Sequence, residues 1–242
     1  MNILSNEKLI RRNGKIGSYA SLSAFILMLG GMYFSYQLTD TNIARQHEEY
    51  LWWMGGLLFA GFLLFQVGTY FMNRFNRRPR PDQALETALK GLTKDYTLYH
   101  YLTSVNHLLV GPAGVWIIET YYQRGNISYQ NGRWQQKGGG FWLWYMKLLG
   151  QEGLGRPDLE IKADLEAINK MLKEKLGEEA PEANLVLVFT DPRAVLDPEG
   201  APYPLLKPKD LKEFLRKESK AHPFRPAQIK RVTDILPTES IT

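Results

Sequence analysis

The chain has 242 residues, of which 44% are hydrophobic and 23% are charged, and its formal net charge is +5. It contains no cysteine, which excludes a disulfide framework, cysteine-ligated zinc, iron–sulfur clusters and thiol catalysis. The length allows one or two domains, and the composition excludes collagen-like, coiled-coil and low-complexity chains.

Two long uncharged segments stand near the N-terminus, at residues 16–38 and 50–73. A membrane-spanning helix needs about 20 mostly apolar residues, so both segments are predicted to cross a lipid bilayer as a helical hairpin. The alternative is a pair of buried core helices, which would be unusually long and apolar for a soluble protein. The first segment exceeds the roughly 7–15 apolar residues of a cleaved signal peptide, which favours a non-cleaved anchor.

Basic residues flank the hairpin and predict its orientation. The loop between the spans, residues 39–49, has only Arg45 against Asp40, Glu48 and Glu49. Cytoplasmic flanks of membrane spans carry an excess of Lys and Arg. Both termini are therefore expected in the cytoplasm, in a multi-pass protein with two spans. The basic residues of the two flanks are Lys8, Arg11, Arg12, Lys15, Arg74, Arg77, Arg78 and Arg80.

The charge is divided unevenly along the chain. Residues 1–80 hold 9 Lys and Arg against 4 Asp and Glu, whereas residues 81–242 hold 21 of each. The basic excess therefore belongs to the membrane part and is not evidence for a nucleic-acid-binding surface, although it leaves room for a local basic patch. We expect a membrane hairpin over 1–80, a domain over 81–198 and a C-terminal helical extension over 199–242.

The soluble part alternates helices and short strands, in chain order. Periodicity and turn residues predict an α/β (α+β) domain with a mixed sheet flanked by helices, long enough to bury its own core. Gly111–Gly114 and Asn131–Gly132 are expected to form hairpin turns. The expected helices are 82–95, 157–176, 209–220 and 226–236, and the expected strands are 97–102, 105–110, 115–120, 127–130 and 184–190.

The most informative stretch is 105–125, which reads VNHLLVGPAGVWIIETYYQRG. Together with the preceding helix, the following hairpin, the long helix and the LVLVF strand, it resembles the nuclease-related domain (NERD) family over roughly residues 82–198. That family belongs to the restriction-endonuclease-like superfamily. The resemblance implies that superfamily's fold and a metal-dependent nuclease ancestry.

The resemblance also implies a site made of an Asp near one strand and a Glu-x-Lys at the end of the next. There the carboxylates hold Mg²⁺, and the Lys stabilises developing charge. In this chain the three positions are Asn106, Glu119 and Tyr121, so only the Glu is retained. Asn106 could still offer one neutral oxygen, which makes Asn106 and Glu119 a weak candidate metal site. Glu86 on the first helix is a candidate for the family's additional acidic residue.

Two nearby side chains could compensate for the lost groups. Arg124 is the nearest cation in sequence to Tyr121. His107 could act as a base, but alternation along a strand puts it on the face opposite Asn106, so we interpret it as structural.

Three functions remain open from the sequence. The preferred hypothesis is a membrane-anchored protein whose cytoplasmic nuclease-related domain is catalytically degenerate and binds nucleic acid or a protein. The second is an active Mg²⁺-dependent nuclease that uses Glu119. The third is a structural membrane protein that supports an assembly such as a homo-oligomer.

An aromatic cluster follows the β-hairpin predicted at Asn131–Gly132. It consists of Phe141, Trp142, Trp144 and Tyr145. Trp and Tyr are enriched at membrane–water interfaces, which makes these residues candidates for contact with the bilayer surface. Contact with a protein partner and simple coverage of the domain core are the alternatives.

Overall fold

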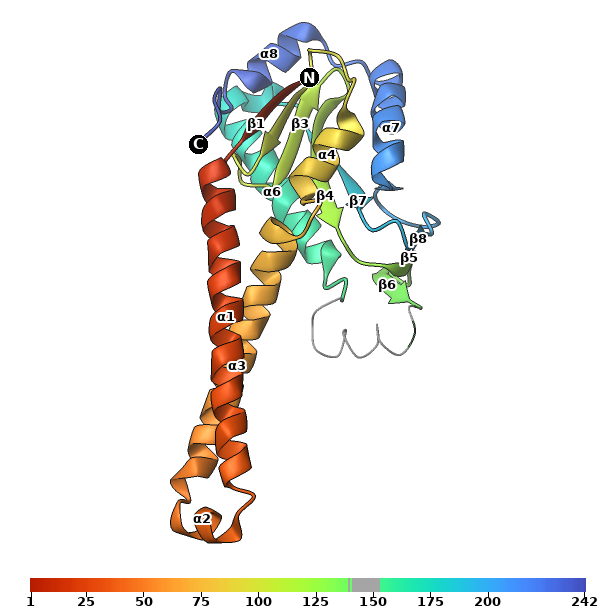
Figure 1. Cartoon of the computed structure of the whole chain (residues 1–242). Coiled ribbons are helices and arrows are strands. Elements are labelled where there is room, and N and C mark those ends of the chain that lie inside the picture. The colour runs from red at the N-terminus through yellow and green to blue at the C-terminus, as the bar shows by residue number, and fades with distance from the viewer. Residues whose placement is uncertain (139, 141–152) are drawn as a thin grey trace. The chain divides into compact units, whose positions relative to one another are not determined.

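The structure is a computed structural model of the whole chain that describes residues 1–138, 140 and 153–242 (Figure 1). The chain forms two compact units. One unit combines Met1–Leu9 with Pro81–Thr242, and the other is Ile10–Arg80. The first nine residues therefore belong to the soluble unit, whereas the sequence assigned them to the membrane hairpin of residues 1–80.

The hairpin unit contains two long helices, α1 (Glu7–Gln37) and α3 (Glu49–Phe71), joined through the short helix α2 (Thr41–Gln46). A π-helical turn, Met72–Asn76, follows α3. Within this unit, the buried positions of α1 include Gly17, Ala24 and Gly31, spaced seven residues apart. A Cβ at Gly31 would lie 2.6 Å from the Leu58 side chain, so the absence of side chains allows the helix backbones to pack closely.

Both α1 and α3 are long and apolar enough to cross a membrane. A core helix of a soluble protein would be mostly buried, whereas the most apolar windows of these helices are only 22% and 11% buried. The hairpin therefore presents an apolar surface along most of its length. The exposed side chains include Leu22, Phe25, Ile26, Leu29, Trp52, Phe59 and Leu63.

The soluble unit is built on a six-stranded mixed sheet with the strand order β1-β2-β3-β4-β7-β9. β2, β3 and β4 form an antiparallel meander, while β1, β7 and β9 each join a neighbour in parallel. The strands are β1 (Asn2–Ser5), β2 (Thr97–His100), β3 (His107–Gly111), β4 (Gly114–Tyr121), β7 (Ala183–Phe189) and β9 (Leu205–Leu206).

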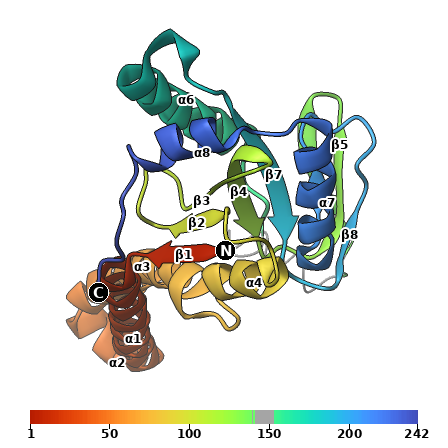
Figure 2. The ribbon, with the colours of Figure 1, turned by 90° about the horizontal axis from the view of Figure 1, so that it is seen from above.

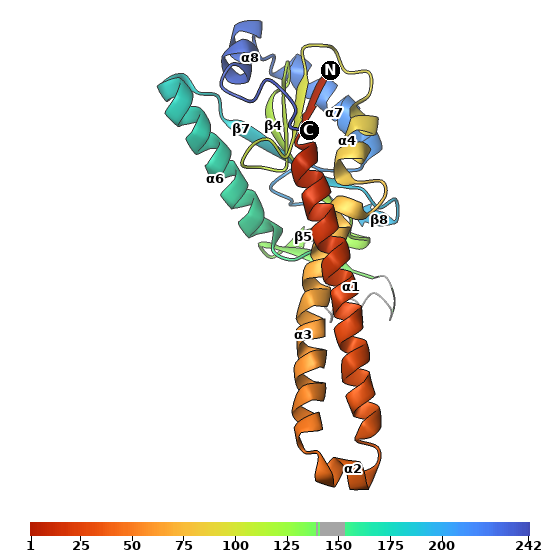
Figure 3. The same ribbon diagram turned by 60° about the vertical axis from the view of Figure 1, so that its left-hand side comes forward.

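Helices cover both faces of this sheet (Figures 2 and 3). On one face α6 (Pro157–Leu176) and α8 (Pro226–Thr233) contribute to the larger core cluster, which includes Ile117 and Leu187. On the other face α4 (Pro81–Leu89) and α7 (Pro208–Ala221) bury their leucines against a second cluster, which includes Leu109 and Ile118. Because β4 is covered on both faces, its side chains are almost all buried.

A smaller sheet has the order β6-β5-β8. Its strands are β5 (Gly125–Gln130), β6 (Arg133–Lys137) and β8 (Ala194–Leu196). Asn131 and Gly132 both have positive φ, at 53° and 73°, as the two central residues of a primed hairpin turn require.

The mixed α/β fold is confirmed, and α6 spans the residues expected for it. The first helix, expected over 82–95, ends at Leu89, because Gly91 adopts a left-handed φ of 88°. The C-terminal extension does not stand apart. The amide of Ile241 donates to the carbonyl of Ser5 at 2.9 Å, which places the C-terminal residues beside the end of β1.

Candidate functional site

Glu119 lies near the end of β4, on the sheet face that α6 and α8 cover. Its neighbours on the same face, Ile117 and Tyr121, belong to the larger core cluster. On β7, Leu187 pairs with Glu119 in the parallel register. Glu119 is only 4% exposed, so the residue that the sequence singled out is buried within the fold.

Tyr121 stands two residues further along the same face and is 6% exposed. Its ring stacks on Phe189 with the centroids 5.3 Å apart and the planes at 23°. Its carbonyl accepts a 2.7 Å hydrogen bond from the amide of Thr190, which extends the parallel ladder. The position at which the motif requires a cation therefore holds an aromatic ring that fills the core.

Asn106 lies just before β3, in the bend that joins β2 to β3, and is half-buried. Its carbonyl accepts a 2.8 Å hydrogen bond from the amide of Tyr101. The last residue pair between β3 and β4 is Leu108 with Ile117. Asn106 lies two residues before Leu108, and Glu119 lies two residues after Ile117. Because the strands are antiparallel, these two positions lie at the same end of the sheet.

Glu86 does not join them. It lies on α4, and its Oε1 is 3.8 Å from Nε2 of His100. His100 and Leu98 lie two residues apart on β2, so their side chains point to the same face of the sheet. Leu98 belongs to the core cluster on the face that α4 and α7 cover. The sheet therefore separates Glu86 from Glu119, because the motif residues occupy the opposite face.

The structure reveals a buried histidine pair that the sequence reasoning missed. His100 and His107 face each other across β2 and β3, are 0% and 1% exposed, and have Nδ1 atoms 2.8 Å apart. The ring of Tyr101 packs edge-on against His107 at 5.0 Å. The placement of His107 on the face away from Glu119 agrees with the structural interpretation. Only the register of the β2–β3 hairpin, which pairs the two residues, could have revealed the contact.

Asp191 is the other buried carboxylate near this end of the sheet, two residues after β7, and it is 7% exposed. Arg193 binds both of its oxygens, with Nε 2.9 Å from Oδ1 and a terminal nitrogen 2.7 Å from Oδ2. This bidentate pair offsets the charge of Asp191.

Comparison with known families decides what this arrangement is. Residues 82–190 match the family model of the nuclease-related domain. This segment of the chain is a nuclease-related domain. Searches among curated proteins and among solved structures gave no match. The mixed sheet between two helical layers is consistent with a restriction-endonuclease-like fold, as the resemblance in the sequence implied.

The residues of this nuclease-related domain do not fit the Mg²⁺ ion that its family implies. Magnesium prefers oxygen ligands, mainly carboxylates, in an octahedral arrangement. Here the candidate ligands are one buried carboxylate, Glu119, and one neutral amide, Asn106, with the phenol of Tyr121 in place of the motif's cation. Among the described residues, no group of three or more His, Asp and Glu side chains could hold a metal ion.

The four aromatic residues expected at the membrane interface, Phe141, Trp142, Trp144 and Tyr145, lie outside the described residues.

Proposed function

We propose that this chain is a membrane-anchored nucleic-acid-binding protein whose nuclease-related domain does not cleave its ligand. The observation that carries the proposal is the stacking of Tyr121 on Phe189 inside the core, at the position where the motif requires a lysine. A neutral ring held by core packing cannot stabilise the negative charge that develops on a phosphate during hydrolysis.

The other motif positions support the same conclusion. Asn106 replaces a carboxylate with a neutral amide, which weakens any bond to a hard cation. Glu119 keeps its carboxylate but is 4% exposed. The domain thus retains the scaffold of its family with only one of the motif's three functional groups, Glu119.

Membrane anchoring rests on the hairpin. Its two helices are long and apolar enough to span a bilayer, and large apolar side chains are exposed along both. Both ends of the hairpin join the same soluble unit, because β1 precedes α1 and pairs with β2. A bilayer crossed by both helices would therefore have the N-terminus and the domain on one side. The basic flanks favour the cytoplasmic side.

A cleavage assay on the full chain in detergent micelles tests the catalytic part of the proposal. Supercoiled plasmid, single-stranded DNA and single-stranded RNA are incubated with Mg²⁺ or Mn²⁺ and the protein. We expect no cleavage, because the motif lacks the charges that hydrolysis needs. Cleavage that Glu119→Gln abolishes, and that the exposed control Glu166→Gln leaves unchanged, would mean that the domain is an active nuclease.

A reversal variant, Asn106→Asp with Tyr121→Lys, restores both lost charges. Cleavage gained by this variant and lost again on addition of Glu119→Gln would support the assignment of the three motif positions.

A filter-binding measurement on the unaltered chain tests whether the protein binds nucleic acid. Binding that weakens steeply with salt is expected. Neither binding nor cleavage would favour a protein partner or a purely structural role in an assembly.

A further inference from the structure

Helix α7 is held in one orientation by its apolar side. Leu211 and Leu215 are fully buried in the core cluster that also contains the leucines of α4. Phe214 packs its ring edge-on against Trp116 on β4, with the centroids 5.2 Å apart. Three anchors on one side of a 14-residue helix fix the opposite side toward solvent.

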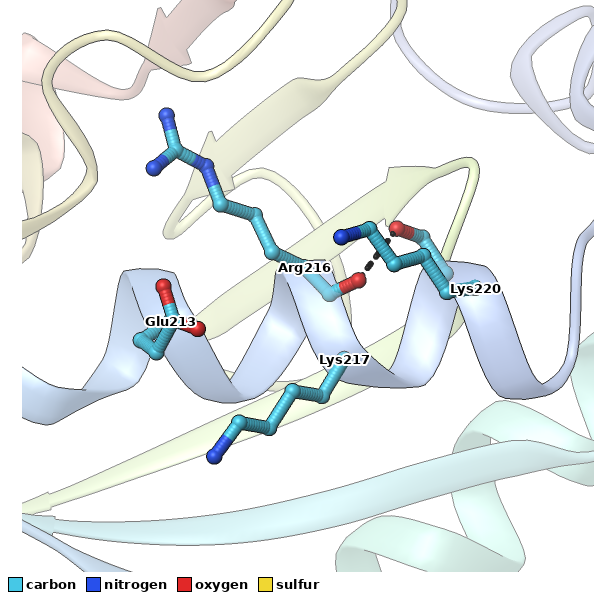
Figure 4. Close-up of a pocket in the computed structure, with 5 residues that line it drawn as sticks. Glu213, Arg216, Lys217 and Lys220 are labelled. Carbon is cyan, nitrogen blue, oxygen red and sulfur yellow. Dashed lines mark hydrogen bonds between the residues drawn. The ribbon is translucent and has the colours of Figure 1, made fainter.

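The solvent side of α7 carries more basic than acidic side chains, with four exposed cations against the exposed carboxylates Asp210 and Glu213. Lys209, Arg216 and Lys220 follow one another at intervals of seven and four residues, which places them along one stripe of the helix, and all are exposed. Lys217 is also exposed beside this stripe. Figure 4 shows the side chains of Arg216 and Lys217 leaving α7 in different directions. Both residues line an open depression together with Glu213, Ser219 and Lys220. We call Lys209, Arg216, Lys217 and Lys220 the α7 ridge.

The cations of the ridge differ from those of α6, the other charged helix. On α6, Lys162 lies 3.8 Å from Glu166, Lys170 lies 3.9 Å from Glu174, and Lys173 lies 3.3 Å from Glu178. In the part of the chain that the structure describes, no carboxylate lies within 4.0 Å of a ridge cation. Positions near a helix C-terminus favour cations, but that effect acts mainly in the last turn, and Lys209 stands at the other end.

The ridge is part of a wider charge asymmetry. Residues 207–231 hold nine Lys and Arg against three Asp and Glu, whereas residues 81–206 hold 12 against 16. The net charge of zero over 81–242 therefore conceals a basic C-terminal segment. Six of the nine cations lie on or beside α7, and the other three, Arg225, Lys230 and Arg231, lie on or beside α8 over the other face of the sheet. The six cations of the α7 part, against its three carboxylates, give this face a local basic excess.

The chemistry of the ridge discriminates among anionic partners. A helix that lies on a bilayer inserts an apolar face, but the apolar face of α7 is buried in the domain. Protein interfaces have apolar or aromatic centres, and the ridge has none. Nucleic-acid backbones are bound mainly through Lys and Arg contacts to phosphates. From Lys209 to Lys220 the helix rises about 16 Å, enough to pass several phosphates of a duplex.

We propose that the α7 ridge is the surface on which this protein binds the phosphate backbone of nucleic acid. The inference rests on the proposed binding function and places that function outside residues 82–190, in the C-terminal segment. The motif residues around Glu119 lie on the other face of the sheet and take no part in this contact.

The test measures binding of a fluorescent 20-base-pair DNA to the full chain in phosphatidylcholine nanodiscs, at several salt concentrations. The ridge variant carries Arg216→Gln, Lys217→Gln and Lys220→Gln. The matched control carries Lys162→Gln, Lys170→Gln and Lys173→Gln on α6, which removes the same charge. We expect the ridge variant to bind at least tenfold more weakly, with a salt slope smaller by roughly 2–3, because each phosphate contact contributes about 0.9 to that slope. The control should bind as the unaltered chain does.

Far-UV circular dichroism checks that α7 remains folded, and the double variant Lys217→Gln with Lys220→Gln replaces the triple variant if it does not. Equal binding by the ridge variant and the unaltered chain would overturn the ridge assignment and leave the binding function standing. Equal weakening in both triple variants would also overturn it. No binding by the unaltered chain would remove the proposed function itself. Ridge-dependent binding to phosphatidylglycerol vesicles, without binding to DNA, would identify a lipid surface as the ligand.

Discussion

Tyr121 shows how a single replacement changes both the chemistry and the packing of a motif. In the family pattern this position carries a charge, whereas here an aromatic ring stacks on Phe189 and is 6% exposed. A lysine at this position would lose the contact with Phe189 and would bring its ammonium group toward the core. In this structure the side chain of Tyr121 therefore contributes to core packing.

Tyr99 provides a prediction at the residue scale. It is 2% exposed on β2, and burial raises the pKa of its phenol to about 12. A tyrosine in the unfolded chain has a pKa of about 10. Below pH 10 the phenol is neutral in both states. Between pH 10 and 12 only the unfolded state loses the proton, so stability falls by up to about 1.4 kcal/mol per pH unit.

The measurement is urea unfolding of the full chain in detergent micelles, at intervals from pH 8 to 12, for the unaltered chain and for Tyr99→Phe. As the pH rises above 10, the free energy of unfolding should fall less for the variant than for the unaltered chain. A difference that stays constant across this range would contradict the account.

Part of the site could be predicted from the sequence, and part could not. The replacements at Asn106 and Tyr121 are visible in the motif, and the alternation along β3 indicated that His107 faces away from Glu119. Contacts between distant residues were not visible, because they depend on register. Tyr121 meets Phe189 through a parallel pairing that closes only after a long helix has crossed over. The His100–His107 contact likewise follows from the hairpin register.

At the scale of elements, β1 is the largest departure from expectation. Its four residues, NILS, precede the first apolar helix and pair in parallel with Thr97–His100. So short a segment has little intrinsic preference for a strand, and its partner lies about 95 positions along the chain. Long helices such as α6 were predicted well, because their periodicity extends over 20 residues.

β1 also provides a matched pair of substitutions. Leu4 is 9% exposed and belongs to the larger core cluster, whereas its neighbour Ile3 is 38% exposed. Leu4→Asp should destabilise the soluble unit by roughly 3 kcal/mol, because it removes core packing and buries a carboxylate. Ile3→Asp should cost about 1 kcal/mol or less, since it carries the same loss of strand preference without burial.

Chemical unfolding of the two variants in micelles, followed by tryptophan fluorescence, measures these differences. Equal destabilisation by the two substitutions would show that β1 is not an integral strand of the sheet.

At the scale of the whole molecule, the chain leaves the soluble unit once, through α1, and returns to it once, before α4. This connectivity requires an even number of membrane crossings between β1 and the rest of the sheet, which agrees with two spans. The sequence predicted the spans from apolar length alone. It could not predict that both chain ends lie in one unit, because that depends on the pairing of β1 with β2 and of Ile241 with Asn6.

The membrane topology can be measured with single introduced cysteines, because the chain has no cysteine of its own. Asn42→Cys places a thiol in the loop between the spans, and Ser104→Cys places one on the domain, both at exposed positions. In intact cells, a membrane-impermeant maleimide should label Asn42→Cys only. Ser104→Cys should react after the membrane is permeabilised. Labelling of both variants from outside, or of Ser104→Cys alone, would contradict a cytoplasmic domain.

We propose that the chain binds nucleic acid through the α7 ridge and that its nuclease-related domain does not cleave it. The most direct measurement incubates the full chain with supercoiled plasmid and Mg²⁺, isolates the protein-bound plasmid, strips the protein and determines the form of the recovered DNA. We expect the bound plasmid to be recovered supercoiled, as in a sample without metal. Recovery of nicked or linear plasmid from the unaltered chain, but not from Glu119→Gln, would contradict it.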